Sequence, residues 1–342
     1  MIISEQKLLG ILSKFKSSKI SVLGDVGLDK YTKGSVDRIS PEAPVPVVLV
    51  KEEIFKLGLA ANVAENIVAL GGNSSLIGII GSDEGAVDLT SLLKNKGIPT
   101  TNLVIDPSRR TILKERIVAE SQQMLRVDYE SPGMISEKPQ KNILGSIAKS
   151  IRYAHALIIE DYAKGLLTKE TIKFSIAKAK EKGIPVLVDP NLKTPAEWYS
   201  GATLLTPNKK EAEFLSGIKI EGMDSLIKAG KSIITKTKSK SLVITLSADG
   251  MAIFKSLDSK PIILPTFAKE VFDVSGAGDT VIAVLGLVLS CGEDLELAAY
   301  IANLAAGIEV SKRGTATVSQ AEIIQAYNTQ LLHIYLTTLK SL

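Results

Sequence analysis

A regular alternation of short apolar segments with longer amphipathic segments constrains this chain more than any other feature of its sequence. After a first apolar segment at residues 20–23, the alternation runs from residue 60 to residue 245. Strands that alternate with helices form a mostly parallel sheet, because each helix carries the chain back across one face before the next strand begins. The sequence therefore predicts an α/β protein with a doubly wound, mostly parallel sheet.

The individual elements are predicted from apolar periodicity and from the residues that interrupt it. Parallel strands are expected at residues 20–23, 75–80, 156–159, 186–188, 203–205 and 242–245, and antiparallel strands at 251–254 and 261–264. Helices are expected at residues 60–70, 84–94, 136–150, 168–181, 208–215, 223–236, 277–290, 294–310 and 319–339.

Two segments break this alternation. Residues 30–56 contain three prolines and then the apolar run Val47–Val50, and residues 111–130 look like two strands around a turn at Glu120. Proline within a strand pattern indicates an edge strand or an irregular ribbon, so residues 30–56 are expected outside the main sheet. Residues 111–130 are interpreted as a second β excursion of the same kind. We therefore expect one α/β domain over residues 1–342, with a small β lid inserted at about 30–56 and 111–130.

Composition excludes several classes of protein. The 342 residues include 41 basic and 37 acidic side chains, and a formal net charge of +4 does not indicate a nucleic-acid partner. The longest apolar run, Val281–Leu289, is too short to span a bilayer, so no membrane association is expected. Cys291 is the only cysteine, which excludes a disulfide within the chain and favours the reducing cytoplasm.

The string with the clearest chemistry is Asp273-Val274-Ser275-Gly276-Ala277-Gly278-Asp279, which leads directly into an apolar helix. Backbone N–H groups of such a turn, together with the start of the helix, form a concave anion site. A hydroxyl bound between this site and Asp279 would lose its proton to the carboxylate, while the N–H groups stabilise a transferring phosphoryl group. The alternative is a helix cap with a convenient glycine turn.

Three other positions have a functional and a structural interpretation. Asp29 follows the first strand, where open α/β sheets bind ligands, but it is also compatible with a solvated loop acid. Asn62 opens a helix, where capping competes with substrate contact. Asn208 and Glu211 have the Asn-x-x-Glu spacing of a helix start, so a cap with an exposed acid is the alternative to an ion site.

Taken together, the motifs resemble those of the PfkB/ribokinase family of sugar kinases over roughly residues 15 to 320. The strings that carry the resemblance are Gly24-Asp25-Val26, Arg38–Val47, Ala60–Ala64, Gln122-Gln123 with Arg126, Asp161-Tyr162 with Lys164-Gly165, Gly201–Asn208 and Asp273–Thr280. The lid string Arg38–Val47 is similar to that of the heptose 7-phosphate kinases within the family, and general ribokinases lack it.

The resemblance implies a role for each matching residue. It implies catalysis by Asp279 with Gly276, Ala277 and Gly278, and sugar contacts from Asp29, Gly58, Asn62, Asp161 and Lys164. Nucleotide contacts are implied for Asn208, Thr245, Gly250, Ser275, Gly278, Asn303 and Gly307, although helix packing is an equal alternative for Gly307. Asn208 and Glu211 are implied to organise Mg²⁺ through water. A distal phosphate needs a lid cation, for which we select Arg38 and Arg126 from a set that also contains Lys33, Lys114 and Arg116.

The implied reaction is ATP-dependent phosphorylation of the anomeric hydroxyl of D-glycero-D-manno-heptose 7-phosphate to the 1,7-bisphosphate, a step toward ADP-heptose and the lipopolysaccharide core. Alternatives are a kinase of this family for another sugar or sugar phosphate, and a non-catalytic nucleotide- or sugar-phosphate-binding homologue. The implied cofactors are ATP and Mg²⁺, with a monovalent cation as a further candidate. The implied partner is a second copy, in a homodimer joined through the lid. No His-x-Gly-His string occurs, so a separate adenylyltransferase is expected to act later.

Three positions depart from the family pattern. Leu59 follows Gly58 where a second glycine is usual, which puts the sugar in doubt. Ser247 replaces a common glycine in the nucleotide-side turn and is small enough to be tolerated. Asn191-Leu192-Lys193 follows Asp189-Pro190 where a lysine is usual, and Lys193 is a candidate substitute.

Overall fold

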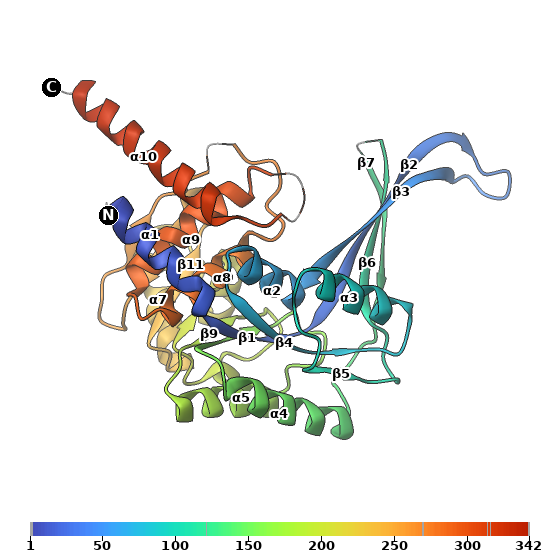
Figure 1. Ribbon diagram of the computed structural model, residues 1–342, viewed down its shortest axis with the longest axis horizontal. Helices are drawn as coiled ribbons and strands as arrows, with labels where there is room; N and C mark the ends of the chain where they lie inside the picture. The colour runs from blue at the N-terminus through green and yellow to red at the C-terminus, as the bar shows by residue number, and fades with distance from the viewer. Residues whose placement is uncertain (1–2, 121, 269, 313, 315, 341–342) are drawn as a thin grey trace.

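The structure is a computed structural model that describes residues 3–120, 122–268, 270–312, 314 and 316–340 (Figure 1). Its main sheet has nine strands in the order β13-β12-β11-β10-β9-β8-β1-β4-β5. Only β12 and β13 run antiparallel to their neighbours. The strands are β1 (Lys19–Gly24), β4 (Asn73–Ile80), β5 (Leu103–Ile105), β8 (Ala156–Glu160), β9 (Val186–Asp189), β10 (Leu204–Leu205), β11 (Ser241–Thr245), β12 (Met251–Phe254) and β13 (Ile262–Leu264). The expected doubly wound α/β fold is confirmed.

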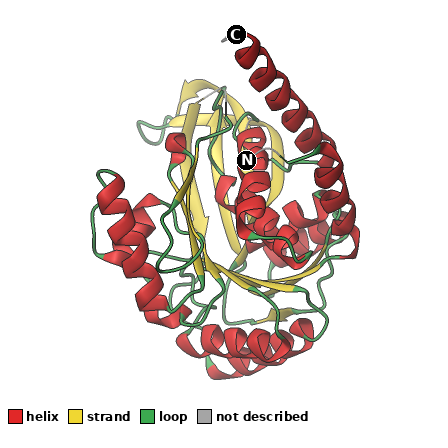
Figure 2. Cartoon of the chain, turned by 90° about the vertical axis from the view of Figure 1, so that its left-hand side faces the viewer, coloured by secondary structure: helices red, strands yellow, loops and turns green. Residues whose placement is uncertain are grey.

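Helices cover both faces of this sheet (Figure 2). Alternate strand residues point to opposite faces, so Ile158 of β8 packs in one core while Leu157 and Ile159 pack in the other. The first core also contains side chains of α1 (Glu5–Lys14), α2 (Ala60–Ala69), α3 (Glu84–Asn95), α8 (Ala277–Ser290), α9 (Leu295–Glu309) and α10 (Gln320–Lys340). The second contains side chains of α4 (Glu137–Ile151), α5 (Lys169–Lys182), α6 (Lys209–Ser216) and α7 (Met223–Thr237).

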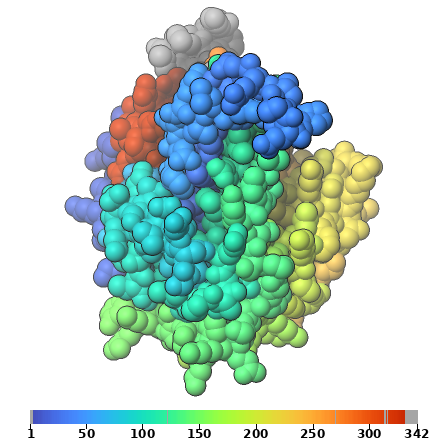
Figure 3. All heavy atoms as spheres, turned by 90° about the vertical axis from the view of Figure 1, so that its right-hand side faces the viewer, coloured from blue at the N-terminus to red at the C-terminus, as the bar shows by residue number. Residues whose placement is uncertain are grey.

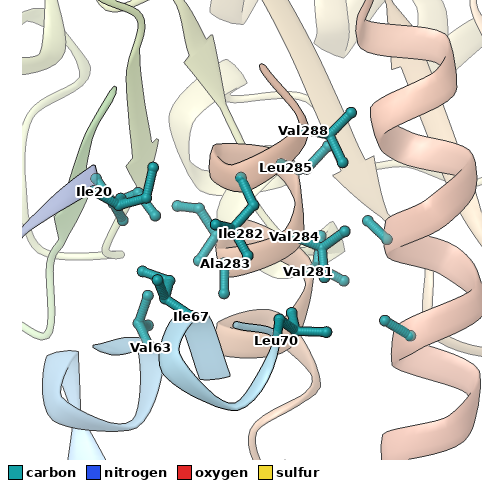
Figure 4. Packing of buried hydrophobic residues seen from close by; sticks show 14 of the residues in the cluster. Ile20, Val63, Ile67, Leu70, Val281, Ile282, Ala283, Val284, Leu285 and Val288 are labelled. Atoms are coloured by element: carbon teal, nitrogen blue, oxygen red, sulfur yellow. The ribbon is translucent and has the colours of Figure 1, made fainter. Parts of the chain in front are cut away.

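Helix α8 is the centre of the first core. Every residue from Asp279 to Val288 is buried, which explains why its sequence is apolar all round rather than amphipathic. Figure 4 shows its side chains close to Ile20 of β1, to Val63 and Ile67 of α2 and to Leu70, the C-cap residue of α2. Helix α8 packs between the strands of the main sheet and the helices α2 and α9. Its N-terminus therefore has a fixed position at the carboxyl edge of the sheet.

The lid is a separate sheet of four strands in the order β3-β2-β6-β7. Its strands are β2 (Val26–Ile39), β3 (Pro46–Leu59), β6 (Ile112–Ala119) and β7 (Gln122–Tyr129). The two segments that interrupt the sequence pattern therefore pair with each other, through a parallel contact of β2 with β6. The β2–β3 hairpin forms a ridge that projects from the body (Figures 1 and 3).

The lid corrects two details of the sequence interpretation. The hairpin begins at residue 26 and ends at residue 59, because β2 and β3 each continue for 14 residues. It is also not broken by proline, since Pro41 and Pro44 lie in the hairpin loop and Pro46 is the first residue of β3, where a ladder tolerates a missing N–H. The turn expected at Glu120 and Ser121 involves Ser121, which lies outside the described residues.

The remaining predicted helices and strands are confirmed to within a few residues of their ends, and the short edge strand β5 was not predicted. Among the described residues, no helix combines the length and apolarity that a membrane span requires.

Candidate active site

The site is built around Asp279, in the first turn of α8. The residue is 8% exposed, and each oxygen of its carboxylate accepts one hydrogen bond. The Asn62 side-chain amide donates to Oδ2 at 2.6 Å, and the Tyr162 hydroxyl donates to Oδ1 at 2.8 Å. Burial raises the pKa of Asp279 to about 6, although both hydrogen bonds favour the charged form. A carboxylate with a pKa near neutrality is suited to act as a general base.

The glycine turn before Asp279 presents its backbone to solvent. Gly276 is the N-cap of α8 with φ of 98°, a left-handed conformation that glycine adopts without strain. Ser275 and Gly278 are exposed, and the Ser275 N–H donates to Asp273 at 2.9 Å. The structure therefore places Gly276, Ala277 and Gly278 as predicted, at a helix N-terminus next to the carboxylate.

Asn62 does not cap its helix, because Leu59 occupies the N-cap position of α2. It is the third residue of the helix, 5% exposed, and its side chain points at Asp279. Asn66 lies one turn further on, where it donates to the Asn62 carbonyl and accepts from Thr280. These bonds tie α2 to α8 at the site.

Asp29 lies within lid strand β2 rather than in a loop after β1. It is 8% exposed and forms a 2.5 Å ion pair with Arg116 of β6. Gly58 lies on the neighbouring strand, where a β-carbon would approach Asp29 Oδ2 to 2.8 Å. The solvated-acid interpretation of Asp29 is therefore wrong, and a side chain at Gly58 would require the Asp29 carboxylate to move.

One face of the lid lies over this site and carries several basic side chains together with Asp29. We call it the inner lid face. Strand register places Asp29, Lys114 and Arg116 side by side, and Arg126 opposite Arg116, all on this face. The Lys114 amine lies 5.7 Å from the centre of the Tyr162 ring. Arg126 is exposed, and Asp128 accepts two hydrogen bonds from its guanidinium, both at 2.9 Å.

Arg38 is not brought to the site. It is an exposed residue near the tip of the hairpin, nine positions beyond Asp29 along β2. At about 3.3 Å per residue this is roughly 30 Å from Asp29, too far for its side chain to reach a ligand held there.

Asp161 and Lys164 have protein partners. The Asp161 carboxylate accepts hydrogen bonds from Thr194 at 2.6 Å and from Tyr199 at 2.7 Å. Lys164 forms a 2.6 Å ion pair with Glu130. Both residues lie beside the site, and these contacts show them holding the loop that carries Tyr162.

Asn208 and Glu211 form a capping box at the start of α6. The Glu211 N–H donates to the Asn208 side chain at 3.0 Å, and the Asn208 N–H donates to the Glu211 carboxylate at 2.8 Å. The capping interpretation is thus correct, but Glu211 is half-buried rather than exposed, and this burial raises its pKa.

Two more carboxylates belong to the same region, and the sequence analysis missed their role. Glu160 ends β8 and Asp189 ends β9, and burial followed by repulsion among the acids raises the pKa of each. Asp189 faces the glycine turn, since a β-carbon on Gly278 would lie 3.7 Å from its Oδ2. Both were recognisable as acids at the carboxyl ends of parallel strands, the edge where such sheets bind ligands.

The residues predicted to contact the nucleotide lie at the end of β11, in the turn before β12 and on α9. Thr245 ends β11 and forms a bridge to Asn208. Gly250 has φ of 87°, and a β-carbon there would come within 2.0 Å of the Leu264 carbonyl. The Asn303 amide donates to the Pro265 carbonyl at 2.7 Å. A β-carbon on Gly307 would meet the Ala268 backbone at 3.0 Å, so helix-to-loop packing explains this glycine.

Two of the three departures from the family pattern, Leu59 and Ser247, lie at positions with positive φ. Leu59 has φ of 58° and ψ of −140°, a region that essentially only glycine occupies, and its side chain is 6% exposed. Ser247 likewise has φ of 54°. Both positions therefore have the backbone conformation that a glycine would satisfy.

A buried base, an exposed glycine turn at a helix N-terminus and a cationic lid define a phosphotransferase that acts on a small hydroxyl compound. The chain belongs to the pfkB family of carbohydrate kinases, whose family model matches residues 35–322.

Among similar proteins, the bifunctional protein HldE of Geobacter metallireducens is 46% identical over 303 residues, covering 89% of this chain and 61% of that protein. The bifunctional protein HldE of Helicobacter hepaticus is 46% identical over 316 residues, covering 92% of this chain and 65% of that protein. The chain thus spans less than two thirds of the length of these relatives.

The fold is also that of solved kinases. A ribokinase of Arabidopsis thaliana complexed with ribose and ATP matches with a TM-score of 0.73 at 18% identity, over 91% of this chain and 98% of that one. Phosphofructokinase-2 of Escherichia coli in complex with potassium matches with a TM-score of 0.77 at 21% identity, over the same shares.

Proposed function

We propose that the chain transfers the γ-phosphoryl group of ATP to the anomeric hydroxyl of D-glycero-D-manno-heptose 7-phosphate, giving the 1,7-bisphosphate and ADP. The observation that carries the proposal is the buried Asp279 carboxylate beside an exposed glycine turn. The likeness to HldE proteins and the lid string Arg38–Val47 support the sugar.

In the proposed reaction, Asp279 takes the proton of the sugar hydroxyl as its oxygen bonds to the γ-phosphorus. The bond from that phosphorus to the bridging oxygen breaks, and ADP leaves with the electron pair. Backbone N–H groups at Gly276–Gly278 stabilise the charge on the transferring group. Arg116 and Asn62 keep Asp29 and Asp279 in place, and the inner lid face supplies the cation for the distal phosphate.

Asn208 and Glu211 are proposed to hold Mg²⁺ through water, and Asp189 joins them. The acids in this region fit a divalent cation, because burial raises the pKa of both Asp189 and Glu211, and the charge of Glu211 raises that of Asp189 further. A bound cation would offset this cost of charging both acids. No cluster of three or more acid, histidine or cysteine side chains in the described chain is arranged to ligate an ion directly, which favours a hydrated Mg²⁺. When bound, Mg²⁺ would neutralise charge on the ATP phosphates.

A monovalent cation is proposed beside the glycine turn. Asp273 and Phe272 both donate backbone N–H groups to the Val310 carbonyl, which brings the turn against the end of α9. Glu309, 1% exposed, lies there, and its burial raises its pKa to about 8. Asp273 of the turn therefore lies close to Glu309 at the end of α9. A pair of neighbouring acids is suited to bind a cation. Activity in potassium compared with activity in a bulky organic cation would test this.

The remaining proposals concern setting and partners. We propose a cytoplasmic homodimer, and we propose that an adenylyltransferase activity acts at a later step of the same pathway. The dimer proposal is supported by large apolar side chains that the lid exposes, including Ile39 at 62% and Leu49 at 63%.

The decisive experiment is an ADP-release assay with heptose 7-phosphate, fructose phosphates, ribose and adenosine as acceptors. Turnover is expected with heptose 7-phosphate. Turnover of ribose or adenosine alone would refute the sugar and retain the kinase. Tight binding of a sugar phosphate without turnover of any acceptor would instead establish a non-catalytic binding protein.

A further inference from the structure

The loop that follows β8 is fixed at nearly every residue from 161 to 165. The Asp161 carboxylate is held by Thr194 and Tyr199 and accepts from the Ala163 N–H at 2.8 Å. The Lys164 N–H donates to the buried Asp25 carboxylate at 2.9 Å. Ala163 has φ of 53°, a left-handed conformation that costs free energy and persists only when its surroundings impose it.

Further bonds close the loop from the other side. Arg109 donates to the Lys164 carbonyl at 2.7 Å, and the Ile135 N–H donates to the Gly165 carbonyl at 3.1 Å. A β-carbon on Gly165 would come within 2.0 Å of the Gly133 carbonyl, so the backbone passes through a gap that only glycine fits. A loop that only connected β8 to α5 would not need this many hydrogen bonds. The hydrogen bonds that fix it therefore need another explanation.

The explanation is the side chain of Tyr162. Its hydroxyl donates to Asp279 Oδ1 at 2.8 Å, and its ring faces the Lys114 amine at 5.7 Å. Lys114 belongs to lid strand β6, while Asp279 belongs to α8. Tyr162 is therefore the contact through which a residue of the lid reaches the catalytic carboxylate.

We propose that Tyr162 is a positioning residue that orients the Asp279 carboxylate for proton abstraction, and that Lys114 makes this orientation depend on the position of the lid. This inference rests on the proposed role of Asp279 as the base, and it assigns a role that the family membership does not supply.

The physical argument concerns a single rotation. A carboxylate fixed at one oxygen can still turn about its last side-chain bond, and Asn62 fixes only Oδ2. The second donor, Tyr162, fixes Oδ1 and so selects one orientation. Small errors in placing a reacting group reduce rates strongly, so the second bond contributes to catalysis beyond its contribution to stability.

Other charges also face this carboxyl group, and the experiment must separate their effects from that of Tyr162. Asp29 and Lys114 face it from the lid, Glu160 from β8 and Asp189 from β9. Of the two lid charges, Lys114 favours the charged carboxylate and Asp29 disfavours it.

The test uses Tyr162→Phe, which keeps the ring under Lys114 and removes only the hydroxyl. The expected result is a kcat roughly 10- to 100-fold lower, with the KM for ATP unchanged. The acidic limb of the pH–rate profile is expected to move to higher pH, because the lost bond favoured the charged carboxylate. Unchanged kcat and an unchanged acidic limb would overturn the proposal.

The link to the lid is tested with Lys114→Met in a double-mutant cycle. Lys114→Met should reduce kcat in the wild-type background and have a much smaller effect when combined with Tyr162→Phe. Independent, fully additive effects would refute the link. Tyr300→Phe is the matched control, because it removes another tyrosine hydroxyl bond, to Gln330, away from the site. It should leave kcat and the pH profile unchanged.

A readout without substrate separates this inference from the proposed function. The carboxyl carbon resonance of Asp279, assigned by its loss in Asp279→Asn, reports the titration of the carboxyl group directly. In Tyr162→Phe the titration is expected at higher pH than in the wild type. If the protein phosphorylates no sugar, the proposed function is refuted. The titration still tests whether the Tyr162 hydroxyl acts on the Asp279 carboxyl group. An unshifted titration would refute the inference even in an active kinase.

Discussion

At the scale of single residues, Asp279 combines deep burial with two donated hydrogen bonds. Asp279→Asn keeps the size of the side chain and removes the base. We expect kcat to fall by roughly 10²–10⁴, the range for a lost general base, with ATP affinity and unfolding temperature nearly unchanged. Steady-state kinetics and calorimetric ATP binding measure the two effects. A variant with near wild-type kcat would remove Asp279 from the mechanism.

Leu59 provides a test of backbone strain. Leu59→Gly relieves a left-handed conformation that costs about 1–3 kcal/mol, which offsets much of the buried apolar surface that is lost. The free energy of unfolding should therefore fall by less than about 2 kcal/mol. Leu57→Ala is the control, since Leu57 is 1% exposed in the same strand and should cost about 2–5 kcal/mol. Equal losses in urea unfolding would show that Leu59 carries no strain.

At the scale of elements, the inner lid face is the part of the lid that we propose recognises the distal phosphate. Arg126→Met should raise the KM for a phosphorylated sugar by roughly 10-fold, because one charge-assisted contact is lost, and should leave the KM for ATP unchanged. Arg110→Met is the matched control, because Arg110 packs over Tyr129 at 6.0 Å, away from the inner lid face. Equal effects of the two substitutions would mean that Arg126 has no specific role.

The elements that the sequence predicted well are those defined by local pattern. The nearly continuous apolar and buried residues of β8 and β9 and the apolar run of α8 can be recognised from consecutive residues. The pairing of β2 with β6 is not, because a register between strands over 80 residues apart leaves no local trace. For the same reason, Asp29 was placed in a loop, although the sequence did identify it as a candidate.

The site shows the same division. Asp279, Asn62 and the glycine turn were predicted from their motifs, and the structure brings them together. Tyr162 was not predicted as a site residue, because its contact with Asp279 depends on a loop held by contacts with Asp25, Arg109 and Tyr199. The neighbouring Asp161 and Lys164 were predicted instead, because charged side chains are the more obvious candidates for contacts with a ligand.

At the scale of the whole molecule, the acids at the carboxyl edge of the sheet link stability to pH. Glu160, Asp189 and Asp279 have pKa values raised above those of the unfolded chain, to about 6 for Asp279. Stability from such groups is fully present below the unfolded pKa and is lost as pH rises through the folded pKa. Mg²⁺ should therefore raise the unfolding temperature more at about pH 8 than at about pH 5. Thermal scans with and without Mg²⁺ measure this difference, and equal shifts at both pH values would argue against a cation site among these acids.

The proposed dimer is a second prediction at this scale. Leu49→Glu places a charge on the exposed apolar part of the hairpin, so it should convert a dimer into a monomer at micromolar concentration. Leu9→Glu is the control, since Leu9 is 43% exposed on α1, and it should leave the mass unchanged. Light scattering gives the mass directly. A wild-type monomer, or a dimer insensitive to Leu49→Glu, would refute an interface through the lid.

The length of the β2–β3 hairpin has a mechanical consequence. Strands of 14 residues reach about 46 Å at 3.3 Å per residue, and their root is pinned where the Ala60 N–H donates to the Asp25 carbonyl at 3.0 Å. The ribbon is thus a lever whose fulcrum lies near the Asp279 carboxylate. A rotation of about 10° at the fulcrum would sweep the tip through roughly 8 Å, whereas Lys114, close to the fulcrum, would travel only a small part of that distance.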